Sequence, residues 1–567
     1  MRVCSTAFAL ALALVPALTP SRASACGGLF CSNPSQPVNQ TAERIVFSSE
    51  SDGSVTAIIE IRYTGTAARF AWVLPVAGSP AVGVSTTAAL DRLQRATNPT
   101  YQLTTTVEGQ CRDSASGVFT ANAGGAADTS AAASDAGMSR VTVVDSGAVG
   151  PYDYVVIHVD PAATPLATVA VDWLNANGYF VQATGSELLE PYLATGMNLL
   201  AFRLTSGADV GSIRPVTVGF GPGLASIPIR PTATAAEDDM GGLVWVLGPA
   251  RAVPVEYASL ELDEALINWL NPSSTYADVV TQAANESGGQ GFVTEMAGDA
   301  APLAESVWGT YEQQNWEAIR ANDPATADGT LLQNAIYALF GLDGLREAIA
   351  TLVPIPAGVT ADELVNCVGC YYPWGSAIPG FDRAAFLAAL DAQVVLPMRQ
   401  ARALFETHAE VTRLFTTMSA SEMTRDPSFD FNPDLPDVSN VHTGTRVVEC
   451  SPSLYQSQAP WRATLPDGRV VRGTGSSWPF TPGTSDLPAN ARILRVGTSG
   501  AGAVLTDNGA RIQAMLDAHN ATIPRVYPFV ASGGGGACTA GHAGARSPLV
   551  VLVALLALGF ARTRRAR

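Results

Sequence analysis

The sequence predicts an α+β protein with a β-rich N-terminal part, a helical middle and a returning β segment, followed by a short C-terminal transmembrane helix. Alternating apolar and polar residues at 44–76 are typical of strands. From about 260 to 425 the apolar residues recur at helical spacing. Strand-like runs return after Pro427, and a 567-residue chain that is 47% hydrophobic can bury a large core.

Composition divides the chain into consecutive parts. These are a signal peptide at 1–25, a β-rich α+β domain at 26–260, a mainly helical region at 261–425, a β-rich segment with a closing helix at 426–519, a spacer at 520–537 and a sorting tail at 538–567. Residues 112–140 are rich in Ala, Gly, Ser and Asp and have little to bury, which predicts a low-complexity insertion in the first domain.

Shorter patterns predict individual elements. Strands are expected near 198–204, 214–220, 226–230, 242–248, 444–449, 469–472 and 491–496, and helices at about 163–176 and 508–519. Two apolar stripes, at 303–319 and 401–418, each predict one face of a helix. His408 lies on the second stripe, where we expect it to pack against its neighbours rather than bind a metal.

The charged residues exclude several kinds of chemistry. All 33 basic residues are arginine, because the chain contains no lysine. A lysine-containing phosphate loop, a Ser-Lys nucleophile pair and Schiff-base catalysis are therefore impossible. With 50 acidic residues and a net charge of −17, the surface repels phosphate backbones, so we expect no nucleic-acid partner.

The N-terminus has the pattern of a secretory signal peptide. An apolar run at 7–18 follows Arg2, and the small residues at 23–25 form a cleavage motif, so we expect signal peptidase to cut after Ala25. The cut leaves Cys26 first, as in a lipoprotein. A lipoprotein signal usually has Leu three residues before that Cys, where this chain has Ala, so lipidation is the alternative interpretation.

The C-terminus combines a glycine run at 533–536, Cys538, an apolar stretch at 548–561 and four arginines at 562–567. In this order the parts resemble the MYXO-CTERM sorting tail. The resemblance implies that a tail-processing membrane protease cuts near Cys538 and that the protein is displayed on the outer surface of the cell envelope. A plain membrane anchor is the alternative, and both interpretations predict an exported, membrane-anchored protein.

An even number of cysteines remains between the signal peptide and the tail. These are Cys26, Cys31, Cys111, Cys367, Cys370 and Cys450. In an exported protein such a set predicts disulfides. Cys26 and Cys31 are close enough in sequence to close a small loop, which leaves Cys111 free to pair with Cys450, although the sequence does not fix the pairing.

The C-x-x-C motif at Cys367 and Cys370 has three interpretations. We favour a structural disulfide, because the chain carries an export signal. A redox site and a zinc site are the alternatives. A redox site prefers a strand-to-helix context, and zinc needs a second ligand pair at suitable spacing, which the neighbouring sequence lacks.

Asp430, Asn432 and Asp434 copy the first half of a calcium-binding loop, because oxygen ligands at alternate positions can converge on one Ca²⁺ ion. The second half of the loop is missing. Leu435 stands where the loop needs Gly, and Val441 stands where it needs a bidentate Glu. Ordinary turn residues are the alternative interpretation, and the sequence indicates no other cofactor.

Several motifs resemble one bacterial family, catalogued as domain of unknown function twenty-three-thirty, over about residues 26–450. The motifs lie at 26–31, 71–75, 149–153, 173–179, 227–230 and 239–241. The resemblance implies a shared fold and export, and it supplies no catalytic residues because the family has no assigned activity.

The sequence favours a non-enzymatic binding or structural protein of the cell envelope. It has no Gly-x-Ser-x-Gly elbow and no His-Glu-x-x-His motif, and its catalytic residues are unknown. The alternative is a secreted hydrolase that uses a pair of acids not visible in the sequence. A cleft with two carboxyls of perturbed pKa is the feature that distinguishes the hydrolase.

Overall fold

The computed structural model describes residues 39–64, 71–112, 141–179, 181, 186–205, 213–234 and 236–526. It is a mixed α+β protein with a β-rich N-terminal part, as the sequence predicts. Within these residues, no helix has the length and hydropathy to cross a bilayer. The predicted C-terminal transmembrane segment at 548–561 lies outside the described residues.

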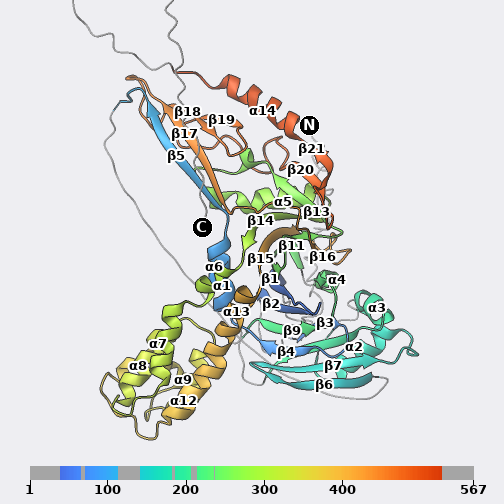
Figure 1. Cartoon of the computed structure of the whole chain (residues 1–567), viewed down its shortest axis with the longest axis vertical. Coiled ribbons are helices and arrows are strands. Elements are labelled where there is room, and N and C mark those ends of the chain that lie inside the picture. The colour runs from blue at the N-terminus through green and yellow to red at the C-terminus, as the bar shows by residue number, and fades with distance from the viewer. Residues whose placement is uncertain are drawn as a thin grey trace, which may run out of the picture.

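A ten-stranded sheet runs through the centre of the molecule (Figure 1). Its strands are, in spatial order, β21 (Ala503–Asp507), β20 (Asn490–Arg495), β13 (Ala258–Leu262), β14 (Gly291–Asp299), β15 (Glu410–Met418), β11 (Ala236–Gly248), β1 (Asn39–Ser49), β2 (Val55–Thr64), β9 (Val216–Phe220) and β4 (Ala81–Val84). The sheet takes strands from all three of the predicted regions 26–260, 261–425 and 426–519.

Three smaller sheets flank it. One is formed by β19 (Val470–Thr474), β18 (Pro460–Thr464), β17 (Val441–Glu449) and β5 (Thr100–Glu108), and another by β3 (Ala71–Val76), β8 (Asn198–Leu204), β7 (Tyr152–Val159) and β6 (Val141–Val149). The third contains β10 (Ala225–Ser226), β16 (Ser428–Phe431) and β12 (Ala252–Pro254).

The central strands are apolar on both faces because both faces are covered. On β11, Trp245 and Leu247 face a core built with helices, whereas Val244 and Val246 face a core shared with β3 and β8. The helices that contribute to the first of these cores are α1 (Thr87–Thr97), α6 (Ala301–Val307), α7 (Thr310–Arg320), α8 (Asp328–Leu339), α9 (Leu345–Leu352), α10 (Ala361–Asn366), α11 (Val368–Tyr371), α12 (Arg383–Leu390) and α13 (Leu396–Thr407). In Figure 1, α7, α8, α9 and α12 form a lobe at the lower left.

The other helices cover the flanking sheets. The β3–β8–β7 sheet packs on α2 (Leu166–Ala176) and α3 (Ser186–Ala194), so the helix expected at 163–176 is present. The core around β13 and β20 includes α5 (Tyr276–Glu286) and α14 (Gly509–Thr522), the closing helix expected at 508–519.

The stripe at 401–418 is not one helix, and that prediction was wrong. Helix α13 ends at Thr407 and β15 begins at Glu410, with His408 at the junction. Val411 and three threonines of β15 are β-branched, which favours a strand where the apolar spacing alone suits either structure. His408 packs as expected, with its Nδ1 2.8 Å from the Leu404 carbonyl and its Nε2 3.1 Å from the Ser48 hydroxyl.

Two further expectations need correction. The stripe at 303–319 is split into α6 and α7, and Tyr311 is 77% exposed instead of buried on the shared face. The strand expected at 226–230 is the two-residue β10 followed by the short helix α4 (Ile229–Thr232). Pro228 precedes that helix, and prolines interrupt a strand because they have no amide hydrogen to donate.

Candidate functional site

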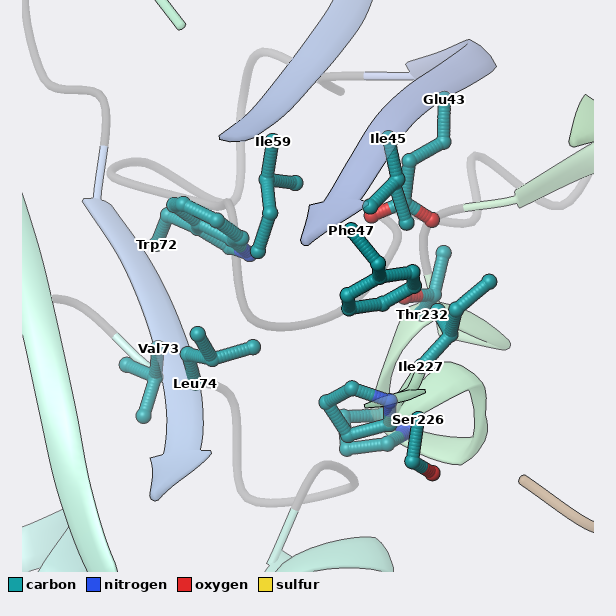
Figure 2. Close-up of a pocket in the computed structure, with 12 residues that line it drawn as sticks. Glu43, Ile45, Phe47, Ile59, Trp72, Val73, Leu74, Ser226, Ile227 and Thr232 are labelled. Carbon is teal, nitrogen blue, oxygen red and sulfur yellow. The ribbon is translucent and has the colours of Figure 1, made fainter. Parts of the chain in front are cut away.

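A small cavity lies between β1, β2, β3 and the segment that carries α4. It measures about 10 Å³, which is room for about one water molecule. Figure 2 shows the Glu43 carboxyl among apolar side chains, which include Ile45 and Phe47 of the same strand. Glu43 is 7% exposed, and burial raises its pKa from 4.5 to about 7. The cavity is too small for an organic ligand, so Glu43 bears on stability rather than on binding.

A second, larger cleft lies where the β5–β17 sheet meets the ten-stranded sheet. Its volume is about 450 Å³, and β13, β14 and β20 form its apolar wall with side chains that include Leu260, Val293 and Leu494. Polar side chains from β5, β17 and the chain after β13 also line it. An apolar cleft of this size with a few convergent polar groups is the usual form of a small-molecule site.

A histidine–carboxylate pair lines the cleft. His442 is the second residue of β17, and its Nδ1 lies 2.6 Å from Oε1 of Glu264, which begins a one-turn helix at Glu264–Leu266. Both side chains are partly buried. The other oxygen of Glu264, Oε2, is buried and has no hydrogen-bond partner among the described residues. A buried acceptor without a donor costs free energy, which a ligand that donates a hydrogen bond would recover.

Tyr101 of β5 holds the imidazole in place. Its ring stacks on that of His442 with 4.5 Å between centroids and 17° between planes, and Trp269 packs edge-on against it at 5.0 Å. Burial raises the pKa of Tyr101, and the carboxylates of Glu264 and Glu295 raise it further. The phenol therefore stays protonated, and its hydroxyl makes no hydrogen bond with any described residue.

Glu295 of β14 is also part of the cleft wall, but its carboxylate is fully engaged. Tyr276 donates a hydrogen bond to Oε1, and Nε of Arg413 donates one to Oε2. Burial raises the pKa of Glu295, while the Arg413 guanidinium opposes that rise. Arg413 extends the network by donating to the Thr97 hydroxyl at 2.9 Å, so this group ties the cleft to the core.

This engagement weighs against Glu295 as one of two catalytic carboxyls. Catalysis by two carboxyls requires both to face the substrate with an oxygen free to exchange a proton. Glu295 gives one oxygen to Tyr276 and the other to Arg413. Glu295 is therefore held as part of the buried network with Tyr276 and Arg413.

Two arginines complete the cleft. Arg492 of β20 pairs with Glu261 at 2.6 Å on the rim. Arg251 donates to the Pro436 carbonyl at 3.0 Å, and burial lowers its pKa while Glu261, Glu410 and Asp437 oppose that shift. Three acids near Arg251 offset its charge, and its Nε is buried without a hydrogen-bond partner among the described residues.

The predicted disulfides are present where the structure describes the cysteines. Cys111 pairs with Cys450, which links the end of β5 to the end of β17, and Cys367 pairs with Cys370. Cys26 and Cys31 lie outside the described residues, as do Ala25 and Cys538. The cross-link joins β5 and β17 at the ends opposite to those that carry Tyr101 and His442.

The candidate calcium residues each serve the backbone. Oδ1 of Asp430 accepts from its neighbour's amide at 2.8 Å, and Oδ2 of Asp434 accepts from the Gly500 amide at 2.7 Å. Asn432 is buried and donates to the carbonyls of Gly497 and Gly500 at 2.6 and 3.0 Å. The described residues contain no group of three His, Cys, Asp or Glu side chains arranged to hold a metal. The calcium interpretation stays a prediction.

Sequence reasoning missed the pair in the cleft. His442 and Glu264 are 178 residues apart and come from different elements. No motif joins them, since their contact depends on β5 and β17 pairing in parallel beside β13.

A family model described as an uncharacterized protein conserved in bacteria (DUF2330) matches residues 20–308. The match covers just over half of the chain. The chain belongs to this family. The part that matches contains Arg251, Glu264, Tyr276 and Glu295, whereas His442 lies beyond it. No curated protein and no solved structure matches the chain.

Proposed function

We propose that this member of the family is an exported, membrane-anchored protein of the cell envelope that binds a small organic cation in the cleft. The observation that carries the binding proposal is the Glu264–His442 pair, because the second carboxylate oxygen of Glu264 is buried without a donor among the described residues. A ligand ammonium or similar donor satisfies that oxygen, and an apolar body fits the wall formed by β13, β14 and β20.

Charge favours a cation over an anion. The chain has 50 acidic and 33 basic residues, so its field attracts positive ligands. Within the cleft, Arg492 is neutralised by Glu261, and acids surround Arg251. An anion would meet these acids, whereas a cation would meet the free oxygen of Glu264.

Calorimetric titration with two probes of the same shape tests the proposal. Benzylamine carries an ammonium beside an apolar ring, and benzoate carries the opposite charge on the same ring. We expect benzylamine to bind with a Kd of about 1 mM and benzoate not to bind. Glu264→Gln should weaken benzylamine binding about tenfold, because a charge-assisted hydrogen bond is lost.

Glu261→Gln is the matched control. It removes a carboxylate from the rim of the same cleft, and that carboxylate already has a partner. Equal binding of the two probes, or equal losses in the two variants, would contradict the proposal.

Export is supported by the N-terminal pattern, the C-terminal tail and the use of cysteine in disulfides. N-terminal sequencing of the protein from cells should give Cys26 as the first residue. Protease added to intact cells should digest the protein. Intact Met1 on a protein that the protease does not reach would refute this part of the proposal. The proposed partners are signal peptidase, a tail-processing protease and the membrane.

A further inference from the structure

The Cys367–Cys370 disulfide lies on the surface of the helical lobe, with both cysteines exposed. It joins residues that are three positions apart, so it closes a very short loop and restricts the unfolded chain little compared with a long-range link. The Cys111–Cys450 disulfide differs on both counts. It spans 339 residues, and Cys450 is 1% exposed.

An aromatic patch lies beside this disulfide. We define it as Tyr337, Phe340 and Trp374, which are 71%, 81% and 54% exposed. Tyr337 and Trp374 stack with 5.9 Å between centroids and 14° between planes. Large aromatic side chains gathered on a surface indicate a contact with another molecule, because leaving them in water is unfavourable.

Helix α8 fixes the disulfide and the patch next to each other. Gln333 of α8 donates to the Tyr372 carbonyl at 3.1 Å and lies against Gly369, one of the two residues between the cysteines. Tyr337 follows Gln333 by about one helical turn on the same face, and its ring stacks on that of Trp374. The chain from Cys367 to Trp374 therefore runs along α8, with the disulfide over one turn and the patch over the next.

The charges near the motif are already partnered. Asp362 of α10 pairs with Arg346 at 2.5 Å, and Arg346 also donates to the side chain of Asn366 at 3.3 Å. A guanidinium thus lies beside the residue that precedes Cys367. Asp362 neutralises that guanidinium, so the exposure of the two cysteines, rather than a nearby charge, makes the disulfide available to an attacking thiolate.

We propose that the exposed Cys367–Cys370 disulfide is a thiol–disulfide exchange site for cysteine-containing polypeptide segments that dock their apolar residues on the aromatic patch. A substrate thiolate attacks one sulfur of the pair and forms a mixed disulfide, while the other cysteine leaves as a thiolate. A second substrate thiolate then attacks the mixed disulfide. The substrate leaves with a disulfide, two electrons stay on Cys367 and Cys370, and both thiolates take up protons.

The buried Cys111–Cys450 link serves as an internal standard in the test. The oxidised full-length chain is mixed without air with a synthetic peptide that contains two cysteines flanked by Leu and Phe. Free thiols are alkylated at intervals and located by mass spectrometry. We expect Cys367 and Cys370 to become reduced about tenfold faster than Cys111 and Cys450, because they are accessible. Equal rates, or no reaction at the exposed pair, would overturn the proposal.

Patch variants test docking separately from access. The Tyr337→Ser, Trp374→Ser double variant should exchange about fivefold more slowly with the peptide and at an unchanged rate with dithiothreitol, which needs no docking. Tyr311→Ser, which removes an exposed tyrosine of α7, is the matched control. If the double variant keeps the full rate with the peptide, the patch is not a docking surface. A loss with both reagents would mean that the substitution disturbs the disulfide itself.

Discussion

Replacing Glu43 with glutamine is expected to stabilise the protein at alkaline pH and to leave it nearly unchanged at acidic pH. Glu43 is buried beside a cavity that holds about one water molecule, and burial raises its pKa from 4.5 to about 7. Below pH 4.5 the carboxyl is protonated in the folded and the unfolded chain, so it adds no pH dependence there.

Between these two pKa values the unfolded chain releases the proton while the folded chain keeps it, so stability falls as the pH rises. Above pH 7 the loss is complete and amounts to about 3 kcal/mol, since one pKa unit corresponds to about 1.4 kcal/mol. Glutamine has nearly the same shape and cannot ionise, so the variant lacks this loss.

Urea-unfolding midpoints of the protein and of Glu43→Gln, followed from acid to alkaline pH, measure the effect. Glu187→Gln, at an exposed site, is the control and should follow the unmodified protein. The reasoning is refuted if the curves of Glu43→Gln and the unmodified protein stay parallel across the range. A difference infrared spectrum adds a direct check, because a protonated carboxyl band should persist near neutral pH and vanish in the variant.

Three further substitutions test other parts of the structure. Arg413→Met should cost about 3–5 kcal/mol of unfolding free energy, because it leaves the buried Glu295 carboxylate without its cation. Urea unfolding near neutral pH measures the loss. A change under about 1 kcal/mol would contradict the role given to Arg413. Asn432→Ala should cost about 1–3 kcal/mol of unfolding free energy, because the Gly497 and Gly500 carbonyls lose a buried donor. An equal loss of stability with and without calcium would indicate a structural role. Stabilisation by calcium in the unmodified protein alone would support the calcium interpretation. The double variant Cys111→Ser, Cys450→Ser should lower the free energy of unfolding by about 2–5 kcal/mol. It should also weaken benzylamine binding, because β5 and β17 carry Tyr101 and His442. Unchanged binding would show that the strands hold the site without the disulfide.

The features that the sequence predicts well depend on local patterns. The strands near 44–76 and the helix near 163–176 follow from spacing that repeats over a few residues. Spacing fails where one apolar pattern suits two structures, as at β15, and where proline interrupts a strand-like run, as at α4. The C-x-x-C disulfide is also local and is predicted correctly.

The candidate site depends on contacts between distant segments. Glu264, His442 and Tyr101 meet because β5 pairs in parallel with β17 beside the central sheet, a topology that no short pattern encodes. Glu43 is a similar case, because its burial and its raised pKa depend on side chains that β2, β3 and the segment of α4 bring around it.

A crystal structure of the full-length chain with benzylamine is the most direct test of ligand binding in the cleft. The ligand ammonium should lie within about 3 Å of Glu264 Oε2, with the ring against Leu260 and Val293. An empty cleft at saturating benzylamine, or a ligand whose ammonium points to solvent away from Glu264, would contradict the account.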